Sequence, residues 1–244
     1  DIFNELPLFD PKVDFLGTNA LKCEISTGDF SYLWFAVAPE KTADSSRFVI
    51  RNVTNFSKND LGLSYLRNGK QNVVAADLKS QIFGAGFWLE SAHFWNENKN
   101  HETYIAGFDY TINFGNGIYL GLEYLHDESG TEKSEYDWLE MFSGTRRTLG
   151  RDYIFGMLNY GWSYVFNSNV VTMMNLNDNS LIVNPSVNFS IFQDVDLMIG
   201  GYFPIGEKGA EFVPEFSDFQ TFLPESMIDI IGKEMVYLWL EVNF

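Results

Sequence analysis

The fold is decided by residues 104–114, Tyr104-Ile105-Ala106-Gly107-Phe108-Asp109-Tyr110-Thr111-Ile112-Asn113-Phe114, in which the kind of side chain alternates along the chain. Even-numbered positions carry only apolar or aromatic residues, whereas odd-numbered positions include Gly, Asp, Thr and Asn. Successive side chains of an extended chain point to opposite faces, so a period of two predicts a strand. One face of this strand is free of charge.

The same alternation continues after this strand. Residues 118–124 repeat it, and Gly115-Asn116-Gly117 between the two stretches predicts a tight hairpin. Residues 154–166, 181–191 and 236–244 alternate as well. Thirteen strands are predicted, near residues 19–26, 30–38, 46–55, 59–67, 71–83, 86–95, 102–114, 117–128, 152–166, 168–178, 180–192, 195–204 and 235–244.

The predicted connections differ in length between the two ends of the strands. One end carries only tight or short turns, near residues 27–29, 56–58, 84–85, 115–116, 167 and 193–194. All the long connections fall at the other end, where the longest loops are 129–151 and 205–234. This arrangement predicts an all-β fold, a transmembrane antiparallel up-and-down β-barrel with short periplasmic turns and long extracellular loops.

A soluble β-sandwich is the alternative, because a water-soluble sheet also buries one apolar face. Three features favour lipid. Several strands reach ten residues or more, which suits a tilted membrane strand. The polar face of the later strands is rich in Gly, Ser, Asn, Asp and Tyr and poor in Lys. Aromatic residues near strand ends, such as Tyr104, Phe114, Tyr164 and Phe166, are typical of membrane interfaces.

The composition argues against several classes of partner, site and segment. Lys and Arg total 16 against 33 Asp and Glu, and the net charge of −17 makes a nucleic-acid partner unfavourable. The single cysteine, Cys23, excludes an internal disulfide and cysteine-rich zinc sites. The longest apolar run, residues 32–38, is far too short for a membrane-spanning helix.

The C-terminal residues Tyr237-Leu238-Trp239-Leu240-Glu241-Val242-Asn243-Phe244 resemble the terminal strand signal of bacterial outer-membrane β-barrel proteins. The resemblance rests on Tyr237, Leu238, Leu240, Val242 and the final Phe244. It implies location in the bacterial outer membrane, contact with its lipid and recognition by the barrel-assembly machinery. Residues 1–4, 7–11, 13–14 and 20–22 are similar to the middle of some larger porin-like outer-membrane proteins.

That second similarity assigns residues 1–18 to an extracellular loop or to a segment leading into the barrel, and 19–244 to the strands. Single-chain bacterial barrels have an even number of strands, so we expect further sequence upstream of Asp1 or a strand from another chain. With more strands the barrel approaches the size that encloses water, which makes a pore plausible.

The polar face of each strand is assigned to the lumen of the barrel. Both signs of charge occur there, and the basic residues concentrate in the first third of the chain, so a positive wall facing a negative one is one interpretation. Mutual neutralisation that only maintains the shape is the other. The excess of acid favours cations if it lines the pore. The candidate pore-lining residues are Lys22, Glu24, Arg47, Arg51, Asp60, Asp77, Lys79, Glu90, Asp109 and Glu123, followed by Asp196 and Glu241.

The two long loops carry apolar residues of their own. In loop 129–151, residues 138, 139, 141 and 142 predict a short helix after a cap at Ser134. Loop 205–234 contains Phe212, Phe216 and Phe219 and then an Ile-rich stretch. Folding into the barrel mouth as a constriction or plug, and packing at the rim against each other or a partner, are both open.

Enzyme signatures are weak. The chain has three histidines, His93, His101 and His126, and none lies in a metalloprotease motif. Ser91 and His93 share one strand face, but positions i and i+2 lie roughly 6.5–7 Å apart, too far for direct proton transfer. No catalytic residue, metal site or cofactor is therefore predicted.

The sequence predicts a porin-like channel for passive diffusion of small hydrophilic solutes or ions. One alternative is a non-conducting barrel that docks a partner protein or other subunits through its rim. A less favoured alternative is a soluble, aromatic-rich carbohydrate-binding β-sandwich.

Overall fold

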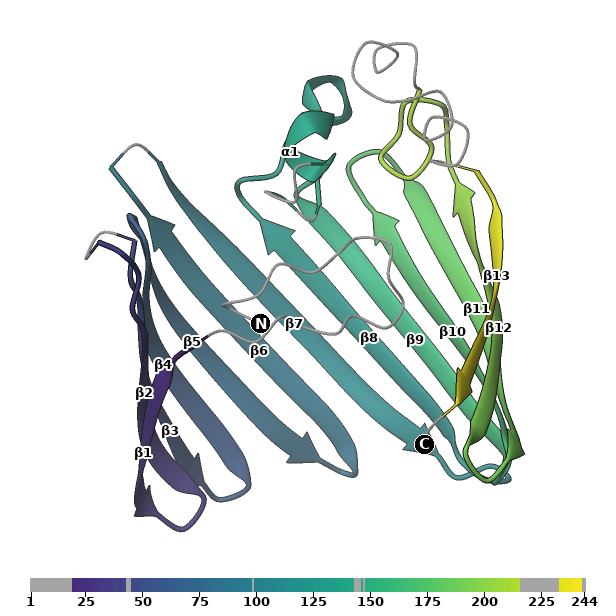
Figure 1. The fold of residues 1–244 in the computed structure, drawn as a ribbon, viewed down its shortest axis with the longest axis horizontal. Helices are drawn as coiled ribbons and strands as arrows, with labels where there is room; N and C mark the ends of the chain where they lie inside the picture. The colour runs from purple at the N-terminus through teal and green to yellow at the C-terminus, as the bar shows by residue number, and fades with distance from the viewer. Residues whose placement is uncertain are drawn as a thin grey trace. The chain divides into compact units, whose positions relative to one another are not determined.

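Strands make up nearly all of the secondary structure (Figure 1). The computed structural model describes residues 19–42, 45–97, 99–142, 146, 148–215 and 233–242. Two short helical segments, η1 (Lys133–Glu135) and α1 (Trp138–Phe142), lie between β8 and β9. The strands are β1 (Leu21–Gly28), β2 (Ser31–Ala38), β3 (Arg47–Phe56), β4 (Asn59–Asn68), β5 (Gln71–Ile82), β6 (Ala85–Trp95), β7 (Asn100–Ile112), β8 (Ile118–Asp127), β9 (Asp152–Ser163), β10 (Phe166–Asn175), β11 (Ser180–Phe192), β12 (Val195–Ile205) and β13 (Met235–Val242).

The strands form one antiparallel 13-stranded sheet in which neighbours in the chain are neighbours in space. This confirms the predicted all-β fold and the up-and-down strand order. No helix in the described ranges is long and apolar enough to cross a membrane. The predicted segment 1–18 lies outside the described residues.

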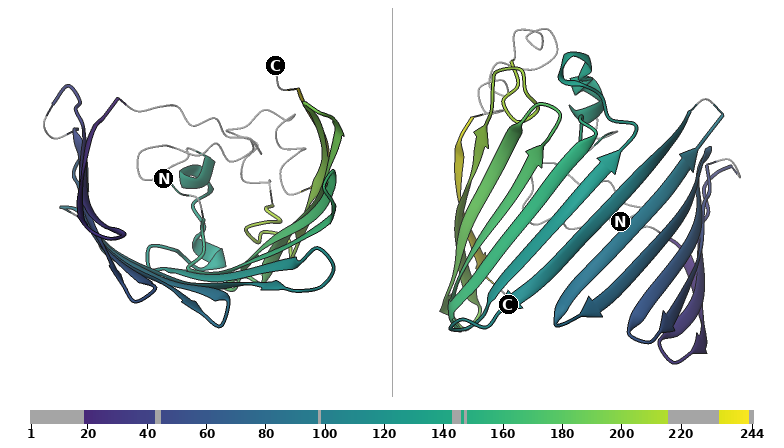
Figure 2. Two further views of the ribbon diagram at one scale, coloured as in Figure 1. Left: turned by 90° about the horizontal axis from the view of Figure 1, so that it is seen from below. Right: turned by 180° about the vertical axis from the view of Figure 1, so that it is seen from behind.

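The chain divides into two compact units, which we describe separately. The first contains β1 to β6, the first array, and the second contains β9 to β13, the second array. Strands β7 and β8 contribute residues to both units. Within each array the strands lie side by side in both views of Figure 2.

The tight turns that connect β1 to β2, β3 to β4, and β5 to β6 have two residues each. In the turns Ser57-Lys58 and Phe83-Gly84 both residues have positive φ, which is the type I′ geometry that matches the twist of a two-residue hairpin. Type I′ turns usually rely on Asn or Gly, so Ser57, Lys58 and Phe83 hold an uncommon backbone conformation.

One predicted turn was misplaced. The sequence predicts a strand through residue 166 and a turn at Asn167, but β9 ends at Ser163 and the turn is Tyr164-Val165. The apolar series at even-numbered positions, Trp162, Tyr164 and Phe166, runs through this turn without a Gly or Asn, so the sequence pattern does not reveal it. Ser163 Oγ accepts a hydrogen bond from the Val165 amide at 3.3 Å, which satisfies the turn backbone locally.

Loop 129–151 contains the predicted helix but not the predicted cap. Helix α1 spans Trp138–Phe142, as the apolar residues indicated. Ser134 lies inside η1, and the side chain that accepts from the start of α1 is Asp137, whose Oδ1 is 3.4 Å from the Glu140 amide. An aspartate at this position suits the positive end of a helix. Residues 216–232 lie outside the described residues, so the plug suggested for loop 205–234 stays a prediction.

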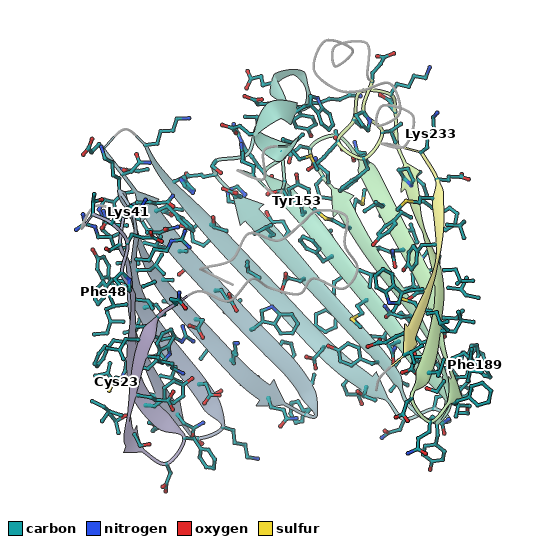
Figure 3. All side chains as sticks on the ribbon, viewed as in Figure 1. Cys23, Lys41, Phe48, Tyr153, Phe189 and Lys233 are labelled. Carbon is teal, nitrogen blue, oxygen red and sulfur yellow. The ribbon has the colours of Figure 1, made fainter. Side chains whose placement is uncertain are left out.

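Buried apolar residues in the first array lie on the face that also bears its charges. Ala36, Val49, Leu66 and Val73 form one cluster, against which Phe94 packs. Large apolar side chains of the opposite face are exposed, including Leu21, Ile25, Leu61, Leu63 and Leu89. Figure 3 shows Cys23 and Phe48 projecting from this opposite face. In this array the buried apolar cluster and the exposed large apolar side chains therefore lie on opposite faces.

Candidate functional site

The candidate pore-lining residues of the first array share one face of the sheet, which we call the charged face. The pairing register runs Trp34 to Arg51 to Ser64, and Gly62 to Asp77 to Glu90, across adjacent strands. Because side chains alternate strictly, a shared register row means a shared face. By the same rows the charged face carries Lys22, Glu24, Arg47, Arg51, Asp60, Asp77, Lys79 and Glu90.

Arg51 and Asp77 form the strongest contact on the charged face. The two guanidinium nitrogens donate to the two carboxylate oxygens at 2.7 and 2.9 Å, and Nη1 also donates to Ser64 Oγ at 2.8 Å. The side chains are only 26% and 11% exposed, so each charge depends on the other for solvation. Gly62 lies beneath the pair, where a Cβ would overlap both charged groups. The missing side chain of Gly62 lets the ion pair lie flat across β4.

Other charges of this face are also matched locally. Lys22 Nζ lies 3.0 Å from Glu24 Oε2 and sits over the Trp34 ring. Asn55 Nδ2 donates to Asp60 Oδ1 at 2.6 Å. Local pairing fits the interpretation that many of these charges neutralise one another, and it gives no support to a wholly positive wall.

A hollow of about 380 Å³ opens on the charged face. Arg51, Ser64 and Asp77 line one part of it, Glu90 lies next to Asp77, and Leu66, Val73 and Phe94 supply apolar surface. Sequence reasoning placed Arg51, Asp77 and Glu90 on this face, but it missed the hollow. Two small residues that pair across β5 and β6 on this face, Ala75 and Ala92, were the available signal.

The second array presents a different polar face, the amide face. Asn159 pairs with Asn169, and Asn169 with Ser186, while Asn167 pairs with Asn188 in the next row. Asn188 Nδ2 donates to Asn167 Oδ1 at 3.1 Å. Within the described ranges, Asn169 Oδ1 is a buried acceptor without a hydrogen-bond partner. In these register rows the face presents neutral amides and hydroxyls instead of charges.

The remaining candidates lie outside the first array. Asp109 on β7 hydrogen-bonds with Tyr119 on β8. Glu123 lies on β8, four residues after Tyr119 and on the same face of the strand, and it is not without a partner. Asp196 Oδ1 accepts from Ser190 Oγ at 2.5 Å and pairs in register with Glu241.

A buried polar cluster at the long-loop end of the second unit was not predicted. Glu211 accepts hydrogen bonds from Tyr153 and Asn175, both at 2.6 Å, and all three side chains are nearly inaccessible. Asn175 also donates to the Tyr136 hydroxyl at 2.8 Å, and Tyr136 donates to Asp178 at 3.0 Å. We call these five residues the rim cluster. It ties residues 131–136 and 206–215 to the turn between β10 and β11.

Burial and the acid groups of the rim cluster change the pKa of the Tyr136 hydroxyl. Burial, and then the negative charge of Asp178, raise the pKa of Tyr136 well above its ordinary value. Tyr136 therefore stays protonated and keeps donating its hydrogen bond. No period or motif in the sequence indicates this cluster, because its members come from separate loops and strand ends.

The residues of the C-terminal signal divide between two faces. Leu238, Leu240 and Val242 lie on the exposed apolar face of β13, and Tyr237 lies on the amide face. Phe244 lies outside the described residues. The role of these residues in assembly stays a prediction.

Ser91 and His93 lie on the face of β6 opposite the charged face. The His93 Nδ1 atom is 3.3 Å from Glu102 Oε1, and its ring stacks on Trp95. Among the described residues, Ser91 makes no hydrogen bond to His93. The imidazole is oriented toward a carboxylate and not toward the serine.

Comparisons with protein-family models, with curated proteins and with solved structures found no match to this chain.

Proposed function

We propose that the chain is the strand-bearing part of an outer-membrane β-barrel channel for passive diffusion of small hydrophilic solutes or ions. The observation that carries this proposal is the exposed apolar face of both arrays. In the first array it includes Leu61, Leu63 and Leu89, and in the second Leu158, Leu238 and Leu240. A continuous apolar face of this kind needs lipid or a partner to cover it. Lipid is the occupant that also accounts for strands of 8 to 13 residues.

Aromatic residues at the tight turns support the same orientation. Each connection at the tight-turn end carries a strongly exposed aromatic side chain, in the turn or at the flanking strand end. Such residues suit a membrane interface, where aromatic rings form girdles. Sequence reasoning named only Phe114 and Tyr164 among them. The residues are Phe30, Phe56, Phe83, Phe114, Tyr164 and Phe192.

The polar faces would then line the water-filled lumen. Paired charges on the charged face and amides on the amide face are compatible with passage of hydrated solutes. The pairing of Arg51 with Asp77 and of Lys22 with Glu24 leaves a moderate excess of acid. We expect a weak preference for cations over anions.

Single-channel recording tests this proposal. Detergent-extracted native protein is added to a planar lipid bilayer, and conductance and the reversal potential under a salt gradient are measured. Steady current with a reversal potential of the cation-selective sign is expected. Failure of the protein to enter bilayers, or solubility without detergent, would overturn the membrane assignment.

The rim cluster supports a second candidate, a non-conducting barrel that docks a partner protein. Buried hydrogen bonds fix residues 131–136 and 206–215 at the long-loop end, where a partner would bind. Insertion into bilayers without current would favour this function. The carbohydrate-binding sandwich has less support, since the described strands form one sheet and a sandwich needs two that pack face to face.

A further inference from the structure

We propose that the hollow on the charged face binds organic monocations, with Glu90 as the counter-ion. The inference deepens the proposed function, on which it rests, because it names a solute class for the same polar face. The hollow has a volume of about 380 Å³, within the range of small-ligand sites. Every residue that lines it belongs to the first unit.

Charge pairing leaves Glu90 as the free acid of the hollow. Arg51 is bonded through both terminal nitrogens to Asp77, so this pair contributes no net charge. Glu90 lies directly across from Asp77 in the β5–β6 register. Among the described residues, no cation or hydrogen-bond donor meets the Glu90 side chain. Because Arg51 neutralises Asp77, Glu90 leaves one net negative charge in the hollow, and a bound cation balances it.

The apolar part of the hollow selects the kind of cation. Leu66 and Val73 are nearly buried and Phe94 packs against them, next to the polar part formed by Ser64 and Glu90. A strongly hydrated metal ion gains nothing from such surface. An ammonium group on a short hydrocarbon chain places its charge at Glu90 and its methylene groups against Leu66, Val73 and Phe94. Because the hollow would bury about half of the ligand's hydrocarbon chain, longer alkylammonium ions should bind more tightly.

Isothermal titration calorimetry on the full chain in detergent tests the proposal with methylammonium, butylammonium and potassium chlorides. Butylammonium is expected to bind more tightly than methylammonium, by about twofold per added methylene, and more tightly than potassium. Glu90→Gln is expected to weaken butylammonium binding about tenfold. Glu24→Gln, on the same face but outside the hollow, makes the same change in net charge and should bind as the wild type does.

Phe94→Ala provides the second arm. It should reduce the advantage of butylammonium over methylammonium while leaving methylammonium affinity unchanged. Circular dichroism confirms that each variant keeps the strand content of the wild type. Equal binding by wild type and Glu90→Gln, or no preference for butylammonium over potassium, would overturn the inference. Binding in detergent without current in bilayers would instead refute the channel and leave the cation site standing.

Discussion

The two arrays make their polar faces in different ways. The first array uses charged side chains, several of them paired, with Arg51 and Asp77 as the best-defined example. The second uses side-chain amides, such as Asn167 and Asn188, which hydrogen-bond as both donor and acceptor. Both arrays carry the same kind of exposed apolar face on the other side. The polar face is therefore the variable part of this sheet, and the apolar face is the constant part.

The difference has an energetic consequence. A charge held by one partner loses most of its compensation when that partner is removed, because a half-buried charge is costly to leave unpaired. An amide that loses one partner retains water as a substitute at an open face. The first array should be sensitive to single substitutions on its polar face, and the second should be tolerant.

The largest loss of stability is expected from a charge on the exposed apolar face, which the two arrays share. Leu63→Arg in the first array and Leu158→Arg in the second should each lower the unfolding free energy by about 2–4 kcal/mol if the residue lies near the bilayer midplane. Reversible urea unfolding in lipid vesicles measures this cost. Asn188→Arg on the amide face is the control and should cost less than about 1 kcal/mol. Equal costs on the two faces would contradict the assignment of lipid to the apolar face.

The ion pair gives the next largest effect. Asp77→Asn should destabilise the protein by about 2 kcal/mol, below the value for a fully buried pair because solvent partly screens the guanidinium. Asn167→Ala should cost about 1 kcal/mol or less. The same unfolding assay compares them. If Asn167→Ala proved as costly as Asp77→Asn, the contrast between the arrays would fail.

A pair of glycines tests the contrast without removing any polar group. Gly62→Ala forces a Cβ into the space of the Arg51 and Asp77 side chains, and we expect a loss of about 1 kcal/mol as they shift. Gly161→Ala meets no atom within 4 Å and should be neutral or slightly stabilising. Thermal unfolding of both variants gives the measurement. Combining Gly62→Ala with Arg51→Met and Asp77→Leu should abolish the penalty, and its persistence would show that the backbone is responsible.

The smallest effect concerns the pH dependence of the second unit. The pKa of Tyr136 is raised in the folded protein, so its contribution to stability is fully present below the unfolded pKa of about 10 and is lost as pH rises through the folded pKa. Absorbance of tyrosinate near 295 nm should show Tyr136 titrating later than ordinary tyrosines. The difference titration between wild type and Tyr136→Phe isolates it. An ordinary midpoint for this residue would mean that the cluster does not exclude water.

The strand order and the sidedness of the charges could be predicted from the sequence, because a period of two is a local signal. Alternation alone assigns Arg51, Asp77 and Glu90 to one face, and the pairing rows place them there. Helix α1 was predicted from four apolar residues close together. Its cap was wrong because Ser134 and Asp137 both favour helix starts, and only the backbone distinguishes them.

Other features depend on contacts between distant residues and leave no local pattern. Tyr153, Asn175 and Glu211 meet only because β9, β10 and the residues after β12 converge. The role of Gly62 follows from an ion pair that spans β3 and β5. The turn at Tyr164-Val165 was missed because its residues continue the apolar alternation of the strands on either side. Pairing geometry, and not residue type, determines each of these features.

Cys23 is the only thiol in the chain, and it is exposed on the apolar face of β1. A nitroxide spin label can therefore be attached at one defined position of the unmodified protein. Relaxation by oxygen, which concentrates in hydrocarbon, and by a water-soluble nickel complex would then report how deep this position lies. Labelling at Cys23 thus allows the membrane depth of the first strand to be measured without any substitution.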